Sequence, residues 1–225
     1  MTFWNILHEI SIWVVVLPLM AGLINYKGLN GDSKWIFYMT VAAVPPQILT
    51  FIVHLKETAL LNILYNLYTP VEFILMYGLF RGKYEMRLNK RLLWISAVIY
   101  GVISVWFIVV YGIRDHFLER WECLNSLIYI IWIMTFLKEQ YTSDSFVIQK
   151  RNPFAWYVLA FIIYSPCTVL VFSLYYYIRR GPHHSALYNL WRIPIICNIL
   201  LYLLFAVGLF ISRKEEISRH HERKQ

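Results

Sequence analysis

Seven apolar runs of about 20 residues, separated by short charged clusters, occupy almost the whole chain. A run of this length is what a helix needs to cross roughly 30 Å of hydrocarbon. Hydrophobic residues make up 59% of the 225 positions, against roughly 45 to 50% in soluble domains. Only helices and closed barrels satisfy their backbone polar groups in lipid, and these runs lack the alternation of barrel strands. The sequence therefore predicts an all-α integral membrane protein.

We expect seven transmembrane helices, at residues 4–25, 35–53, 59–80, 92–112, 121–138, 153–178 and 188–211. They would form one transmembrane domain, residues 1–212, followed by a basic cytosolic tail, residues 213–225. The first run has no basic stretch before it and no small-residue cleavage site after it, so we expect a retained helix rather than a signal peptide. Cys123, Cys167 and Cys197 are widely separated and are expected to be apolar packing residues.

Lysine and arginine are divided unequally between the two ends of these helices. Basic residues near helix ends resist translocation, so the more basic side of the bundle is expected in the cytosol. Of the 21 lysines and arginines, fifteen fall in the first, third and fifth loops and the tail. The six on the other side are Lys56, Arg114, Arg120, Arg179, Arg180 and Arg192. With seven spans this predicts an N-terminus outside, a C-terminus in the cytosol, and a multi-pass protein of the cell's inner (plasma) membrane.

The third loop is the most basic of the expected cytosolic loops. It carries Arg81, Lys83, Arg87, Lys90 and Arg91. Such a loop is attracted to anionic inner-leaflet lipid, and it could also bind a cytosolic signalling partner. This attraction explains the pI near 9.4 without nucleic acid, which we do not expect as a partner.

Prolines lie in several of the expected helices. Pro45 and Pro46 in residues 35–53 and Pro166 in residues 153–178 predict interruptions near the middle of both helices. A parallel repeat of three helices would produce this correspondence, and transporters of that plan bind substrate at interrupted helices. The Pro46-Gln47 pair resembles the dipeptide of PQ-loop and SWEET-like transporters, although here it lies in the second helix without a second copy. Alternatively, these prolines only kink packed helices.

The expected helix 59–80 has a polar face. Its members, three and four residues apart, are Asn62, Tyr65, Asn66, Tyr68, Thr69 and Glu72. An acidic side chain inside a membrane is costly unless it is protonated, paired or hydrated, which makes Glu72 a candidate functional residue. The alternative is a protonated Glu72 that only joins neighbouring helices by hydrogen bonds.

Polar side chains of other expected helices could face this surface. They are Gln47, Asn125, Tyr164 and Asn198. With Tyr65, Tyr68, Thr69 and Glu72 they form the predicted intramembrane ligand site.

Five histidines fall at the expected outer ends of the helices, at the level of several acids. They are His8, His54, His116, His183 and His184. Imidazole and carboxylate together can bind a transition metal, and imidazole can sense external pH. The zinc-protease spacing is absent, so these can equally be ordinary interfacial histidines. We expect no cofactor.

Four short segments carry a resemblance to a family. They are Tyr68-Thr69-x-x-Glu72-Phe73, Asn125-Ser126-Leu-Ile-Tyr129, Phe161-x-x-Tyr164-Ser165 and Asn198-Ile-Leu-x-Tyr-Leu-Leu-x-Ala206. On them the chain resembles uncharacterised seven-helix inner-membrane proteins of Bacteroidetes. Membership would imply a stand-alone membrane module that serves as the sensory partner of a separate kinase.

The leading functional hypothesis is a sensory or signal-transducing module that couples an outer or intramembrane cue to a cytosolic partner. The first alternative is a small-solute or proton-coupled transporter, and the second a membrane-embedded lipid-modifying enzyme. A phosphate-binding Gly-rich loop, a nucleophile elbow and a kinase signature are all missing from the sequence, which favours a protein without catalytic residues. The sequence leaves the ligand and the oligomeric state open.

Overall fold

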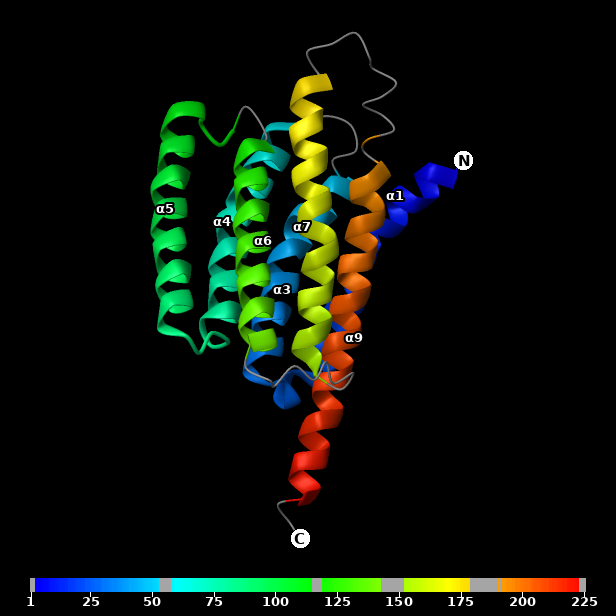
Figure 1. Cartoon of the computed structure of the whole chain (residues 1–225). Helices are drawn as coiled ribbons and strands as arrows, with labels where there is room; N and C mark the ends of the chain where they lie inside the picture. Colours follow the sequence, from blue (N-terminus) through cyan, green and yellow to red (C-terminus); the bar gives the residue numbers. More distant parts are fainter. Residues whose placement is uncertain are drawn as a thin grey trace.

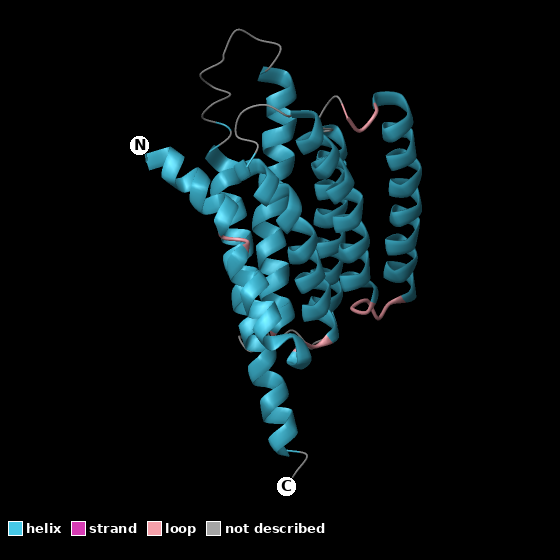
Figure 2. Cartoon of the chain, turned by 180° about the vertical axis from the view of Figure 1, so that it is seen from behind, coloured by secondary structure: helices cyan, strands magenta, loops and turns pink. Residues whose placement is uncertain are grey.

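The computed structural model describes residues 3–52, 58–114, 119–142, 152–178, 190 and 192–222. These residues are helical, apart from short connections, and contain no strand (Figures 1 and 2). The first elements are α1 (Phe3–Trp13), α2 (Val16–Asn25), the short 3-10 helix η1 (Tyr26–Gly28) and α3 (Gly31–Ile52). They are followed by α4 (Thr58–Arg81), α5 (Arg87–Tyr111), α6 (Glu119–Thr142), α7 (Pro153–Ile178) and α9 (Arg192–Glu222). The prediction of an all-helical protein is confirmed.

Within the described residues, six segments are long and apolar enough to cross a membrane. They are Phe3–Gly28, Gly31–Ile52, Ala59–Arg81, Arg87–Tyr111, Pro153–Leu174 and Arg192–Ser212. Helix α6 is not among them, because charged and polar side chains such as Glu122, Asn125 and Lys138 interrupt its apolar sequence. It nevertheless runs alongside α4, α5 and α7 in the bundle (Figure 1). A multi-pass helical bundle is thus supported, and residues 153–178 are helical as predicted.

The first span is not the single helix 4–25 that we predicted. The α-helix breaks at Val14 and Val15, between α1 and α2. Pro18 explains the break, because it has no N–H to donate to Val14 and its ring crowds that carbonyl group. Leu17 N–H donates to the Val14 oxygen instead, at 3.1 Å. As a result α1 points away from the bundle axis (Figures 1 and 2).

The predicted interruptions at Pro45, Pro46 and Pro166 are wrong, because α3 and α7 continue through these prolines as helices. Threonine hydroxyls donate to carbonyl oxygens close by. Thr50 donates to the Pro46 oxygen at 2.8 Å, and Thr168 to the Tyr164 oxygen at 3.0 Å. Such bonds help a helix in an apolar environment to tolerate the N–H group that proline removes.

The end of the bundle from which the C-terminus extends is solidly packed with aromatic rings. We call this the C-terminal end, and the opposite end, where α1 and α9 begin, the N-terminal end. The Phe73 and Tyr100 rings stack with centroids 3.6 Å apart, and Trp132 lies 5.1 Å from Phe73. The cluster extends through Phe80 towards the loop between α4 and α5. This aromatic core joins α4, α5, α6 and α7.

Tyr157 connects three helices within this region. Its hydroxyl lies 2.8 Å from the Ser33 hydroxyl, which links α7 to α3. Its ring lies against Gly208 of α9, where a Cβ atom would overlap the ring. Glycine is therefore required at this position by the close approach of α7 and α9, as at small-residue contacts in other membrane helices.

Helix α5 lies at the edge of the bundle and packs mainly against α4 and α6 (Figure 1). Two indole N–H groups of α6 reach it: Trp121 donates to the Ser104 hydroxyl and Trp132 to the Ser96 hydroxyl, both at 2.9 Å. Its remaining faces are rich in exposed apolar side chains such as Val102. Such a surface suits contact with lipid.

The loop between α4 and α5 is held in place by Glu139 of α6. The Glu139 carboxylate accepts 2.6 Å hydrogen bonds from the backbone N–H groups of Glu85 and Met86, and another from the Asn89 side chain. Burial alone would raise the pKa of Glu139, but these hydrogen bonds and the charge of Lys90 outweigh it and lower the pKa below its usual value. A charged Glu139 thus caps the start of α5, which begins at Arg87 rather than residue 92.

The five basic residues proposed as a partner surface differ in their surroundings. Lys83 is 27% exposed, forms an ion pair with Asp32 and lies 4.6 Å from the centre of the Phe154 ring. Arg81, Arg87, Lys90 and Arg91 are exposed. Helix α9 continues through Glu222, so most of the predicted tail is helical.

Candidate functional site: two adjoining cavities

Among the residues that the structure describes, two adjoining cavities lie between the helices. The larger of these has a volume of about 440 Å³ and is lined by α1 and the first turns of α9, together with α3, α4 and α7. The smaller has a volume of about 110 Å³ and lies among α3, α4, α6, α7 and α9. We call them the outer cavity and the inner cavity. Both are lined by Gln47, Tyr65, Tyr164 and Asn198, so these four side chains form the wall between them.

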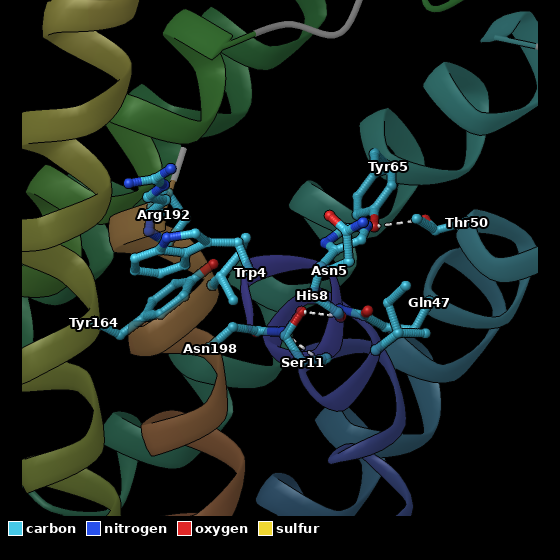
Figure 3. A pocket seen from close by; sticks show the side chains of 13 residues that line it. Trp4, Asn5, His8, Ser11, Gln47, Thr50, Tyr65, Tyr164, Arg192 and Asn198 are labelled. Carbon is cyan, nitrogen blue, oxygen red and sulfur yellow. Dashed lines mark hydrogen bonds between the residues drawn. The ribbon is translucent and has the colours of Figure 1, made fainter. Parts of the chain in front are cut away.

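The break in the first span brings α1 over the outer cavity. Asn5 and His8 of α1 face Tyr65 of α4 and Gln47 of α3, whereas Trp4 lies on the other side, beside Tyr164 and Arg192 (Figure 3). The Thr50 and Tyr65 hydroxyls lie 3.0 Å apart and join α3 to α4 at the cavity wall. A cavity of this size falls within the roughly 300 to 1,000 Å³ of small-molecule sites.

The side chain of Asn198 bridges α9 and α1. Its Nδ2 donates to the backbone oxygen of Ser11 at 3.1 Å, which positions it at the wall between the cavities (Figure 3). Near the beginning of α9, the Arg192 guanidinium lies 4.2 Å from the centre of the Trp4 ring. A cation over an aromatic face at this distance is a favourable contact. The outer cavity therefore has a cationic rim and an amide-lined floor.

The inner cavity contains two carboxyl groups. Glu72 of α4 and Glu122 of α6 line it and are 4% and 8% exposed. The Thr69 hydroxyl lies 3.1 Å from Glu122 Oε2 and 3.1 Å from the Tyr65 carbonyl oxygen, so its proton is shared between them. Glu122 also lies in the first turn of α6, where the helix N-terminus favours negative charge.

Glu72, in contrast, makes no hydrogen bond or ion pair with any part of the chain that the structure describes. It lies three residues after Thr69 and seven after Tyr65, which places all three on the same face of α4. Lysine and arginine are absent from the described lining of the inner cavity. A buried carboxyl group without a donor or a cation is costly in the charged form, so Glu72 requires a proton, a cation or water in the cavity.

The structure brings seven of the eight residues of the predicted intramembrane site together. Four form the shared wall, and Tyr68, Thr69 and Glu72 line the inner cavity. Asn125 is fully buried but does not line either cavity. Their role in binding remains a prediction.

The predicted intramembrane site did not include Glu122, which lies near the expected end of its helix. A signal was present, because Glu122 precedes Asn125 and Ser126 by three and four residues and so shares their helical face. Tyr202, buried one turn after Asn198, lines the inner cavity as well.

Four of the five histidines of the predicted outer site lie outside the described residues. They are His54, His116, His183 and His184. His8 lines the outer cavity. Among the residues that the structure describes, no group of three or more His, Cys, Asp or Glu side chains could hold a metal ion.

Comparisons with protein-family models, with curated proteins and with solved structures gave no match. The resemblances to the Bacteroidetes proteins and to PQ-loop transporters remain predictions.

Proposed function

We propose that the chain is a seven-span sensory module of the inner (plasma) membrane, with its N-terminus outside and its C-terminus in the cytosol. It binds a small polar ligand in the two adjoining cavities and signals to a cytosolic partner through the α4–α5 loop and the tail. The observation that carries this proposal is the order of the two cavities. The outer cavity is lined by α1 and the first turns of α9, whereas the inner cavity lies deeper, among α3, α4, α6, α7 and α9, where its lining residues Tyr68 and Tyr202 also belong to the aromatic core.

Helix α6 supplies a direct connection between the two regions. Glu122, in its first turn, lines the inner cavity, and Glu139, in its last turns, holds the α4–α5 loop. Between them, the Trp132 carbonyl oxygen accepts a 2.6 Å hydrogen bond from the Tyr84 hydroxyl of the same loop. A ligand that displaces α6 would therefore change the contacts of the basic loop. Signalling requires two conformations that the ligand binds with different affinity, and such a displacement would provide the second one.

The experiment fills the cavity without needing to know the ligand. In a background carrying Cys123→Ser, Cys167→Ser and Cys197→Ala, a spin label is attached at Lys90→Cys on α5. Asn198→Phe, at the shared wall, should change the mobility of this label. The matched control is Val102→Phe, which adds a similar ring on the 66% exposed face of α5. An identical label spectrum in both variants would contradict coupling between cavity and loop.

Transport is the second candidate, favoured by Glu72, a buried carboxyl without a partner among the described residues. A proton-coupled carrier uses such a group by loading and unloading a proton. Proteoliposomes with a pH gradient and an internal pH dye separate the two functions. Proton flux that Glu72→Gln abolishes would indicate transport, whereas a loop response without flux indicates sensing.

A further inference from the structure

We infer that the inner cavity binds the ammonium group of an organic cation. This inference rests on the proposed function and specifies the class of ligand. Three independent properties of the inner cavity carry it: the charge of its lining, the aromatic side chains around it, and its size relative to the outer cavity.

The charge argument begins with the two carboxyl groups. Glu72 has no hydrogen-bond donor or cation within the described residues, and Glu122 receives only a share of the Thr69 proton. Both are more than nine-tenths buried and line the same small cavity. A cationic ligand would satisfy them together, because a buried charge is stable when it is paired. In their charged form the two carboxyl groups would repel an anionic ligand.

The aromatic side chains favour an organic cation over a hydrated metal ion. Tyr65, Tyr68, Tyr164, Phe172 and Tyr202 all line the inner cavity. Aromatic faces attract alkylammonium groups, and cages of this kind recognise methylated ammonium. Metal ions instead prefer a dense set of oxygen or nitrogen ligands, and the described residues provide no cluster of three metal-binding side chains.

Size places the ammonium group in the inner cavity and the rest of the ligand in the outer one. The inner cavity, about 110 Å³, is smaller than the roughly 150 Å³ cavity that holds benzene in another protein, so it suits a head group rather than a ring. The two cavities share the wall formed by Gln47, Tyr65, Tyr164 and Asn198. The amides of that wall can donate to and accept from a polar body beyond the head group.

The decisive probe is choline, compared with 3,3-dimethylbutan-1-ol, which has the same shape but carbon in place of the charged nitrogen. The wild-type chain is purified in a maltoside detergent and an amine-free buffer, and it is titrated separately with choline and with the alcohol. Methylammonium serves as a smaller cation and n-butylamine as an unbranched one. We expect at least one cation to raise the unfolding temperature and the neutral isostere to have no effect. The inference would be overturned if the neutral isostere raised the unfolding temperature as much as choline does, or if no cation raised it.

Substitutions then locate the site. Glu72→Gln and Glu122→Gln should each weaken binding of the cation by about tenfold or more, because each removes one buried charge that faces it. Glu85→Gln removes an exposed acid from the α4–α5 loop and should leave the dissociation constant unchanged. Binding that survives both cavity substitutions would place the cation elsewhere. If either variant fails to fold, the comparison of choline with its neutral isostere on the wild-type chain still tests whether the cavity binds a cation.

The ammonium group could belong to a soluble amine or to a lipid head group. Nanodiscs of phosphatidylglycerol, with and without phosphatidylethanolamine, distinguish these sources. Competition by phosphatidylethanolamine against the soluble cation would indicate a lipid head group, and unchanged affinity a soluble amine. The label experiment at Lys90 uses no ligand, so its failure would contradict the sensory function without affecting this inference, and the reverse also holds.

Discussion

At the scale of single residues, the contact between Tyr157 and Gly208 tests how closely α7 and α9 must approach. A Cβ atom at Gly208 would overlap the Tyr157 ring, which is fully buried and linked to Ser33. Gly208→Ala should therefore lower the free energy of unfolding by about 1 to 3 kcal/mol, as in other overpacked cores. Thermal unfolding in detergent measures the loss.

The matched control is Gly101→Ala on α5. A Cβ atom there meets nothing within 4 Å, so the chain should be unchanged or slightly more stable. If both substitutions destabilise the protein equally, the close approach of α7 and α9 is not what selects glycine at position 208.

Glu139 makes a pH-dependent contribution to stability. Its pKa is lowered in the folded state, so its stabilising effect is present above the usual value of 4.5 and is lost as the pH falls through the folded-state pKa. Glu139→Gln removes the negative charge and one of the two acceptor oxygens, and it should cost about 1 kcal/mol at neutral pH, the usual order of a lost capping hydrogen bond. The difference from wild type should shrink below pH 4.5.

Unfolding temperatures at pH 7 and pH 3.5 would test this expectation. Glu85→Gln, which alters an exposed side chain of the same loop, should behave as wild type at both values. A deficit of Glu139→Gln that does not depend on pH would show that the negative charge of the Glu139 carboxylate does not stabilise the folded state.

Most of the candidate site could be predicted from spacing, since residues three and four apart share a helical face and polar faces turn away from lipid. This located Tyr65, Tyr68, Thr69 and Glu72. That Glu72 and Glu122 line the same cavity could not be predicted. It depends on the position of α6 along the bundle axis relative to α4. Packing between helices sets this position, and a single sequence does not contain it.

At the scale of elements, the break between α1 and α2 is the feature that shapes the outer cavity. We expect Pro18→Ala to restore the hydrogen bond to the Val14 carbonyl group and to straighten the first span. Spin labels at Ile6→Cys and Leu23→Cys, both exposed positions, would then move apart. Their backbone separation would approach about 26 Å, the length of a straight helix of that many residues.

The control for this experiment is Pro166→Ala with labels at Leu159→Cys and Leu170→Cys. Helix α7 is already continuous through Pro166, so this distance should not change. A Pro18→Ala variant with an unaltered distance would mean that tertiary packing, rather than the proline, holds α1 at its angle.

The prolines show what sequence reasoning can and cannot resolve for an element. The existence of the helices followed from apolar length, and residues 153–178 were predicted correctly. The effect of each proline could not be predicted. It depends on whether neighbouring groups donate a hydrogen bond to the carbonyl oxygen four residues earlier, which the proline leaves without its usual donor. Pro166 lies within a continuous helix, whereas Pro18 lies in the first turn of α2, directly after the break that ends α1.

At the scale of the whole molecule, the proposed topology rests on the distribution of the basic residues and on the number of spans. A cytosol-dependent reporter fused after Gln225 should be active, and the same reporter fused before Met1 should not. This result requires an odd number of spans and thus includes α6, whose polar positions leave it outside the six clearly apolar segments. Activity at both ends would indicate an even number and contradict the seven-span arrangement.

The edge position of α5 has a consequence for the order in which the bundle assembles during synthesis. Both hydrogen bonds to its serines come from Trp121 and Trp132, and its first turn is capped by Glu139, all residues of α6. Helix α6 follows α5 along the chain. During synthesis α5 therefore enters the membrane before α6, and its Ser96 and Ser104 hydroxyls lack their indole donors until α6 has been synthesised. In a chain arrested just after Tyr111, α5 would therefore pack only weakly against the helices already made. A chaperone that shields polar helices in the bilayer would bind α5 at this stage.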